Sequence, residues 1–250
     1  MAELNFDELN NINSLSTAEY FSSMEISESD KRRREELADL IDDVMLFFFS
    51  AYLVFTDKAK ALYDRNYFVK MVYDRLEDAV MEVTGIDEYI KNRLQTISEE
   101  VVDTTINRLN KQSDALTPYE SFETSPPSEE PLPPSGSSPE MGENADTYNT
   151  DLPYWLSEKR AFFIAVDTAN TIMNYTDFTV AKAEGMTRKQ WLTQRDEKVR
   201  VTHIALDGQT IGIDDVFVVG DSIMRFPKDE EYSPNPKETI RCRCSIRYLR

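Results

Sequence analysis

Apolar positions recur at helical spacing through the first half of the chain and predict three helices. The first should begin near Ser29, and its apolar stripe comprises Leu37, Leu40, Ile41, Val44, Met45, Phe48, Tyr52 and Phe55. The second is expected over residues 58–84 and the third over residues 87–112. Short joints favour an antiparallel bundle over residues 29–115. Residues 1–28 are polar, and we interpret them as a mobile leader with at most one short helix.

The composition changes after this bundle. Seven of the eleven prolines lie between Pro118 and Pro139, mixed with Ser and Glu. Such a stretch buries too little apolar area to offset the conformational entropy that ordering would cost. We therefore expect residues 116–152 to be a disordered linker rich in Pro, Ser and Glu.

Beyond the linker, the pattern predicts one long helix and then a change of period. The helix is expected from Pro153 to Glu184, and Gly185 should end it. The segments expected next are a strand over residues 189–193, a helix from Val199 to Leu206, a turn at Asp207–Gly208 and an extended piece through Phe217 and Val219. Together they predict a carboxyl-terminal domain over residues 153–250.

Residues 239–248 alternate in polarity and predict a half-buried closing strand. One face would carry Ile240, Cys242, Cys244, Ile246 and Tyr248, and the other Arg241, Arg243 and Arg247. Both thiols would then point into the core. The predicted fold class is α+β: an amino-terminal helical bundle, a Pro-rich linker, and a long helix packed on a small α+β domain.

Charge and composition argue against some functions and locations. The net charge is -18, and the acidic excess lies in residues 1–180. That part is therefore poorly suited to nonspecific nucleic-acid binding, which needs cations. We interpret the basic run Arg32–Arg34 as a solvated face. Neither a signal peptide nor an apolar run of the ~20 residues that span a bilayer is visible.

The chemistry-bearing residues gather near the carboxyl end. His203, Cys242 and Cys244, with the carboxylate of Asp207, form a ligand set that would suit zinc. The Cys-x-Cys spacing does not make a disulfide framework, so the thiols should be reduced. The alternative is that they pack as small hydrophobic groups while His203 bonds a neighbouring strand.

A hydrolytic role is a second interpretation of these residues. His203 would act as general base, oriented by Asp207 or Asp196, in a metal-dependent hydrolase or nuclease. No Ser elbow, phosphate loop or nucleophile motif accompanies them. We therefore assign no catalytic residue and expect a protein that is not an enzyme.

A structural interpretation assigns these positions other roles. Asp196 and Arg200 would form an orienting ion pair across a tight loop. Gly208 would let the chain reverse, and Pro227 would fix the entry to the last segment. Arg241, Arg243 and Arg247 would form a cationic rail and are candidate contacts to DNA.

The order of these residues resembles a known family. Trp191-Leu192-Thr193, Asp196-x-x-Val199-Arg200-x-x-His203, Leu206-Asp207-Gly208, Phe217, Pro227 and Cys242-Arg243-Cys244 look like the phage head morphogenesis domain typified by phage Mu protein F. The resemblance covers about residues 155–248 and includes the long helix before the motif. Where the family often has Asn before Cys-Arg-Cys, this chain has Arg241.

The resemblance implies a minor head protein of a tailed phage or prophage. Such proteins bind the portal during procapsid assembly and assist DNA packaging or ejection. It also implies contacts with scaffold, major capsid protein or packaged DNA. The expected location is the host cytoplasm during assembly and then the interior of the virion head. No cofactor is implied, and zinc remains a candidate from the residues alone.

Overall fold

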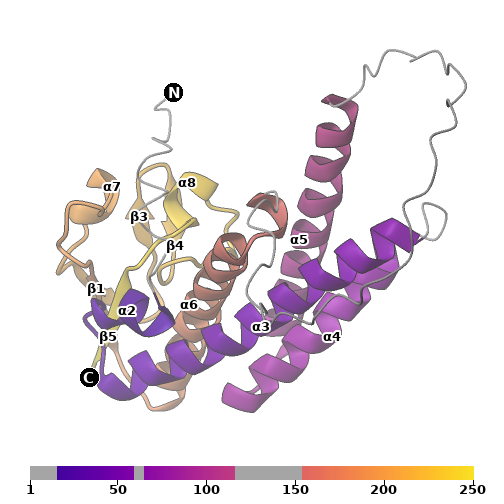
Figure 1. The fold of residues 1–250 in the computed structure, drawn as a ribbon. Helices are drawn as coiled ribbons and strands as arrows, with labels where there is room; N and C mark the ends of the chain where they lie inside the picture. Colours follow the sequence, from indigo (N-terminus) through magenta and orange to yellow (C-terminus); the bar gives the residue numbers. More distant parts are fainter. Residues whose placement is uncertain (1–15, 59–64, 116–153) are drawn as a thin grey trace, which may run out of the picture.

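The computed structural model describes residues 16–58, 65–115 and 154–250 (Figure 1). Its elements are α2 (Thr17–Ser22), α3 (Glu28–Lys58), α4 (Arg65–Val83), α5 (Glu88–Ala115), the 3-10 helix η1 (Tyr154–Leu156), α6 (Glu158–Ala183), β1 (Arg188–Leu192), α7 (Val201–Ile204), β2 (Thr210–Gly212), β3 (Phe217–Val219), β4 (Ser222–Met224), α8 (Pro236–Thr239) and β5 (Ser245–Leu249). The predicted α+β class is confirmed. The predicted linker at 116–152 lies outside the described residues.

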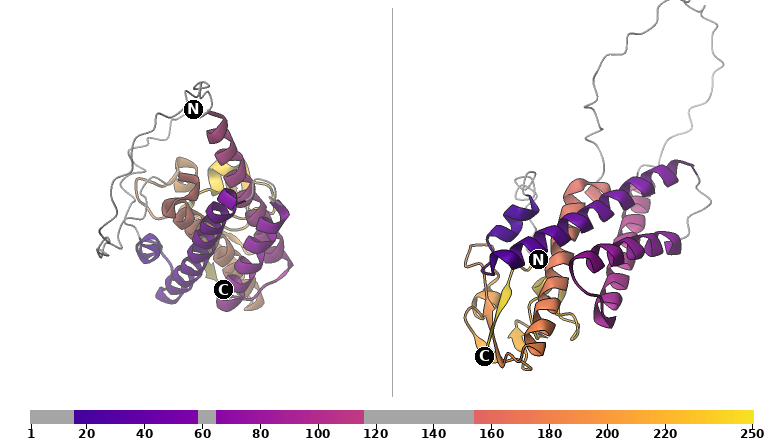
Figure 2. Two further views of the ribbon diagram at one scale, coloured as in Figure 1. Left: turned by 45° about the vertical axis from the view of Figure 1, so that its right-hand side comes forward. Right: turned by 90° about the horizontal axis from the view of Figure 1, so that it is seen from below.

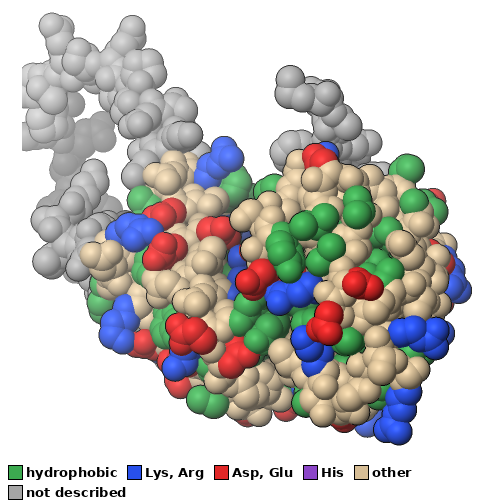
Figure 3. All heavy atoms as spheres, turned by 180° about the vertical axis from the view of Figure 1, so that it is seen from behind, with side chains coloured by type: hydrophobic (Ala, Val, Ile, Leu, Met, Phe, Trp, Pro, Cys, Tyr) green, Lys and Arg blue, Asp and Glu red, His purple; other side chains and the backbone are tan. Residues whose placement is uncertain are grey.

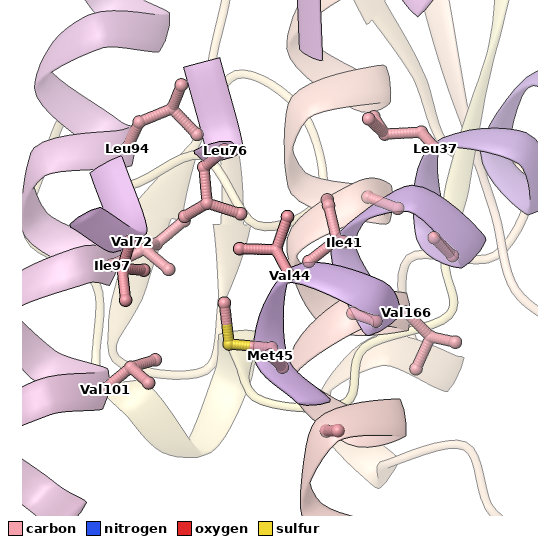
Figure 4. Close-up of a cluster of buried hydrophobic side chains, with 14 of the residues drawn as sticks. Leu37, Ile41, Val44, Met45, Val72, Leu76, Leu94, Ile97, Val101 and Val166 are labelled. Carbon is pink, nitrogen blue, oxygen red and sulfur yellow. The ribbon is translucent and has the colours of Figure 1, made fainter. Parts of the chain in front are cut away.

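One apolar core joins the helices before residue 116 to those after residue 153. Apolar side chains of α4 and α5 point towards α3, among them Leu76 and Leu94, which face Val44 and Met45 (Figure 4). Helix α6 packs along α3 and adds Ala165, Ala169, Ile172 and Met173 to the same core (Figure 2). The long helix of the carboxyl-terminal segment therefore completes the core of the amino-terminal helices.

The segment predicted as a mobile leader is packed over part of its length. Residues 1–15 lie outside the described residues. Ser16 caps α2 in a capping box with Glu19, and the α2 segment buries Tyr20, Phe21 and Met24 in the helical core. Helix α2 is the one short helix allowed for this segment, and the mobility of the leader stays a prediction.

Helix α6 begins later than predicted. Its N-cap is Ser157, whose hydroxyl accepts the backbone N–H of Arg160, and η1 precedes it. The predicted start, Pro153, lies outside the described residues. The other end agrees with the sequence: Gly185 adopts φ +73°, a left-handed conformation that favours glycine at a helix end.

The carboxyl-terminal segment forms two small antiparallel sheets. In the first, β1 lies between β2 and β5, and Trp191 pairs with Ile246. In the second, β3 pairs with β4. A second apolar core lies here, made of Trp191, Leu206, Phe217, Val219, Met224, Cys242 and Cys244. Helices α4 and α5 lie on one side of α3 and α6, and these strands on the other (Figure 1).

The closing strand is shorter than predicted. Only Ser245–Leu249 forms β5, whereas Pro236–Thr239 forms helix α8. Arg241 adopts φ +55°, which breaks the alternation, and Ile240 is 54% exposed. Both thiols are nevertheless buried, as predicted. Among the described residues, no helix is long and apolar enough to cross a membrane.

Candidate functional site

The structure brings His203, Cys242 and Cys244 together. His203 Nδ1 lies 3.4 Å from Cys244 Sγ and 3.5 Å from Cys242 Sγ. The three candidate ligand atoms all lie within 4.8 Å of one another, and all three residues are buried. Within the described part of the chain, this cluster is the group of His, Cys, Asp and Glu side chains that has the geometry of a metal site.

The local backbone brings these three side chains together. His203 lies on the single turn α7, whose N-cap is Arg200. The Arg200 guanidinium donates to the carbonyl of Ile240, which joins α7 to the segment that carries both cysteines. The positive φ of Arg241 then turns the chain after α8 so that Cys242 enters the core. The backbone N–H of Cys242 also donates to Thr239 O.

Glu238 completes the cluster, and the sequence analysis missed it. His203 Nε2 lies 3.1 Å from Glu238 Oε2, and both side chains are 2% exposed. The Thr202 hydroxyl donates to the same carboxylate oxygen. A carboxylate that accepts from one ring nitrogen fixes the tautomer and leaves the other nitrogen free to accept or to ligate. Only the placement of α8 could reveal this partner, because Glu238 stands in no recognisable motif.

The two thiols differ in proton affinity. The pKa of Cys242 is lowered well below its usual value because Cys244 donates a hydrogen bond to it, and His203 lowers it further despite burial. The pKa of Cys244 is raised because it donates that hydrogen bond and because it is buried. Cys244 therefore holds its proton more tightly than Cys242 does.

A small cavity adjoins the cluster. Its volume is about 20 Å³, and its walls include His203, Cys242 and Cys244. A space of this size holds about one water molecule. Its other walls are Gln194, Lys198, Val199, Arg200, Arg241 and Arg243. The cluster therefore faces a cavity that suits a single small ligand with basic side chains around it.

The carboxylates predicted to act with His203 have other partners. Asp207 lies beyond the end of α7, accepts from the backbone N–H of Thr193 at 2.9 Å and pairs with Arg195. These contacts lower the pKa of Asp207 against the opposing effect of burial. Asp196 pairs with Arg243 at 2.6 Å, so the predicted Asp196–Arg200 pair is wrong.

The comparisons with known proteins give one match. Residues 137–247 match the family described as Phage Mu protein F like protein. This part of the chain is similar to that family, and the match supports the resemblance found in the sequence. No curated protein and no solved structure gave a match. The match indicates a phage head morphogenesis protein, and among the described residues it runs from η1 into β5.

Other motif residues of the Mu F-like region, residues 137–247, pack or hydrogen-bond around the site. Trp191 is fully buried and meets the His203 ring edge-on at 5.8 Å and Phe217 at 5.1 Å. Gly208 adopts φ +79°, and its N–H donates to the carbonyl of Trp191, so the predicted reversal occurs there. Pro227 contributes its carbonyl, which accepts the side-chain amide of Asn174.

The arginines of the predicted cationic rail contact other side chains of the Mu F-like region. Arg243 pairs with Asp196, and Arg241 lies over the ring of Phe163 at 4.1 Å. Arg247 is exposed and lies beside Gln190. Acidic and basic side chains are interspersed on the face drawn in Figure 3. The arginines predicted to contact DNA thus do not form one continuous exposed strip.

Proposed function

We propose that this protein is a minor head protein of a tailed phage or prophage that associates with the portal during procapsid assembly. It would assist DNA packaging or ejection from inside the head. Scaffold or major capsid protein would be further contacts. The single observation that carries the proposal is the match of residues 137–247 to the Phage Mu protein F like family.

The geometry is compatible with a structural role. The charged motif residues all have partners within the described residues: Asp196 pairs with Arg243, Asp207 with Arg195, and His203 with Glu238. The cavity beside the cluster holds about one water, which leaves little room for a substrate. These contacts support a domain whose shape, held by buried polar bonds, serves recognition of other head proteins.

Copurification tests the proposal. The full chain would be co-expressed with the portal protein encoded by the same genome, and with a portal from an unrelated phage as control. We expect capture by its own portal only. Mass spectrometry of procapsids assembled with and without portal should then find the chain only in the former. Absence from procapsids and virions that contain portal would reject the proposal.

The alternative function is a metal-dependent hydrolase or nuclease that uses His203, Asp207 and Asp196. The contacts of the described residues give it little support, because both carboxylates are paired with arginines and neither bonds His203. A nuclease assay of wild type and His203→Ala, with added divalent metal, tests it. Metal-dependent cleavage that His203→Ala abolishes would favour this alternative.

Direct contact with packaged DNA is a further element of the proposal. Arg247 is the exposed member of the predicted set Arg241, Arg243 and Arg247. Phosphate contacts release counterions, so binding should weaken steeply as salt rises. A salt titration of DNA binding by wild type and Arg247→Gln measures this. A response that is flat in salt would exclude phosphate contacts.

A further inference from the structure

We propose that the chain binds one zinc ion through His203 Nδ1 and the sulfurs of Cys242 and Cys244. The ion would pin α7 to the segment before β5. This inference is independent of the proposed role at the portal, because it concerns only how the Mu F-like region is held together.

The separations between the candidate ligand atoms suit a tetrahedral ion. Zinc takes imidazole nitrogen at about 2.0–2.1 Å and thiolate sulfur at about 2.3 Å, so tetrahedral angles separate the two ligand atoms by about 3.5 Å. The structure places His203 Nδ1 3.4 and 3.5 Å from the two sulfurs. An ion could therefore enter between the three atoms with little movement of the chain.

The second nitrogen of the imidazole is already oriented. A histidine that ligates a metal almost always gives its other N–H to a carboxylate, a carbonyl or water. Glu238 Oε2 occupies that position at 3.1 Å, and the Thr202 hydroxyl donates to the same oxygen. Glu238 is thus a positioning residue, and it directs Nδ1 towards the sulfurs.

The cysteines are held in place before any ion binds. The carbonyl of Cys242 accepts the side-chain amide of Asn170 at 2.9 Å, and that amide is buried on α6. The backbone of Arg243, between the two cysteines, accepts from Gln194 at 2.7 Å. Preorganised ligands lower the entropic cost of binding the ion.

The fourth position opens onto the cavity of about 20 Å³ that His203, Cys242 and Cys244 line. One water fits there and would complete a tetrahedral His-Cys-Cys-water set. Two thiolates neutralise the charge of the ion, and the basic side chains around the cavity favour those thiolates. Imidazole with soft thiolate ligands selects zinc over magnesium, calcium or manganese.

The composition of the chain makes the test unambiguous. It contains one His and two Cys, and all three lie in this cluster. A thiolate-to-metal signal from the full chain without an affinity tag can therefore arise only here. Reconstitution with cobalt(II) should give thiolate-to-cobalt charge transfer and the d–d bands of a tetrahedral ion. Elemental analysis after zinc reconstitution should find one zinc per chain.

Variants separate positioning from ligation. Cys242→Ser and Cys244→Ser should each weaken or remove the charge-transfer band. Glu238→Gln keeps the three ligands and should weaken zinc affinity about 10–100-fold, a typical effect for a partner of a ligating histidine. Glu231→Gln is the matched control, because Glu231 is half exposed and pairs with Arg225; its affinity should match wild type.

The wild-type protein decides the outcome if a variant does not fold. Reduced, folded wild type that binds neither zinc nor cobalt stoichiometrically would overturn the proposal. So would thiols that react with a thiol reagent equally fast with and without zinc. Zinc that protects both thiols until a chelator is added would support it.

Discussion

Asn170 donates its side-chain amide to the carbonyl of Cys242 at 2.9 Å, and both residues are buried. The oxygen of the same amide accepts Arg34 Nε from α3 at 3.2 Å. One side chain on α6 therefore connects the amino-terminal helices to the cysteine segment. The candidate metal cluster and the helical core are parts of one packed unit through this residue.

Asn170→Ala should destabilise the protein by about 2–3 kcal/mol. The substitution leaves the carbonyl of Cys242 and the Nε of Arg34 buried without this partner, and an unsatisfied buried group costs about 1–3 kcal/mol. Chemical denaturation of wild type and variant measures the difference. Asn92→Ala, at an exposed position of α5, is the control and should change stability by less than about 0.5 kcal/mol. Equal losses for the two variants would contradict the assigned role of Asn170.

Arg34→Leu should cost about 2–4 kcal/mol. Arg34 is 1% exposed, and its Nη2 contacts Asn174 at 3.0 Å and Asp177 at 2.8 Å. Removing one partner of a buried pair leaves the other without compensation, although the partial exposure of Asp177 reduces the penalty. Arg32→Leu, in the same basic run but exposed, is the control and should be nearly neutral. Thermal unfolding of both variants compares them, and an unchanged midpoint for Arg34→Leu would refute the prediction.

Gly220→Ala should destabilise the protein more than Gly208→Ala. Both glycines have positive φ, +62° and +79°, so both variants carry similar backbone strain of roughly 1 kcal/mol. A Cβ on Gly220 would also lie 2.7 Å from Glu238 Oε1, whereas one on Gly208 meets nothing within 4 Å. Glu238 cannot yield freely, because His203 and Thr202 hold its other oxygen.

Denaturant titration of the two glycine variants gives the difference, and we expect a further ~1 kcal/mol for Gly220→Ala. If the zinc site exists, only Gly220→Ala should also weaken zinc binding, because it displaces the carboxylate that orients His203. Equal stability of the two variants would show that Glu238 is free to move.

The sequence predicted the helices and strands more accurately than the contacts between them. Helical spacing located α3, α4, α5 and α6, because long apolar stripes specify a buried face. It also placed Cys242 and Cys244 in the core. The closing strand was too long because Arg241 takes a positive φ, which polarity alternation does not reveal. Polar and apolar residues do alternate along the predicted strand, but its first residue, Thr239, belongs to helix α8 (Pro236–Thr239).

Long-range polar contacts were the least predictable feature. Asp167 and Asn170 on α6 both hydrogen-bond to the segment after α8: Asp167 accepts the N–H of Arg241, and Asn170 donates to the carbonyl of Cys242. Arg160, on the same helix, instead donates to Thr105 on α5. Arg34 was interpreted as solvated, since a basic run gives no sign of which member is buried. Such partners depend on how distant elements pack, and no local pattern encodes that.

Asp42→Asn should stabilise the protein at neutral pH and not in acid. Asp42 lies half-buried on α3, and burial, followed by repulsion from Asp43, Asp39 and Glu158, raises its pKa to about 6. A raised carboxyl pKa means that the folded state binds the proton more tightly than the unfolded state. The contribution of Asp42 to stability is therefore fully present below the ordinary carboxyl pKa of about 4 and is lost as pH rises through 6.

The expected gain for Asp42→Asn is about 1–2 kcal/mol at pH 7, reduced from the full shift because the group is half-buried. It should fall towards zero near pH 4, where wild-type Asp42 holds its proton. Denaturation curves from pH 4 to pH 8 measure the trend. Glu36→Gln, an exposed carboxylate on the same helix, controls for the loss of one negative charge from an acidic chain. A gain of equal size at every pH would show that burial of the charged form is not the cause.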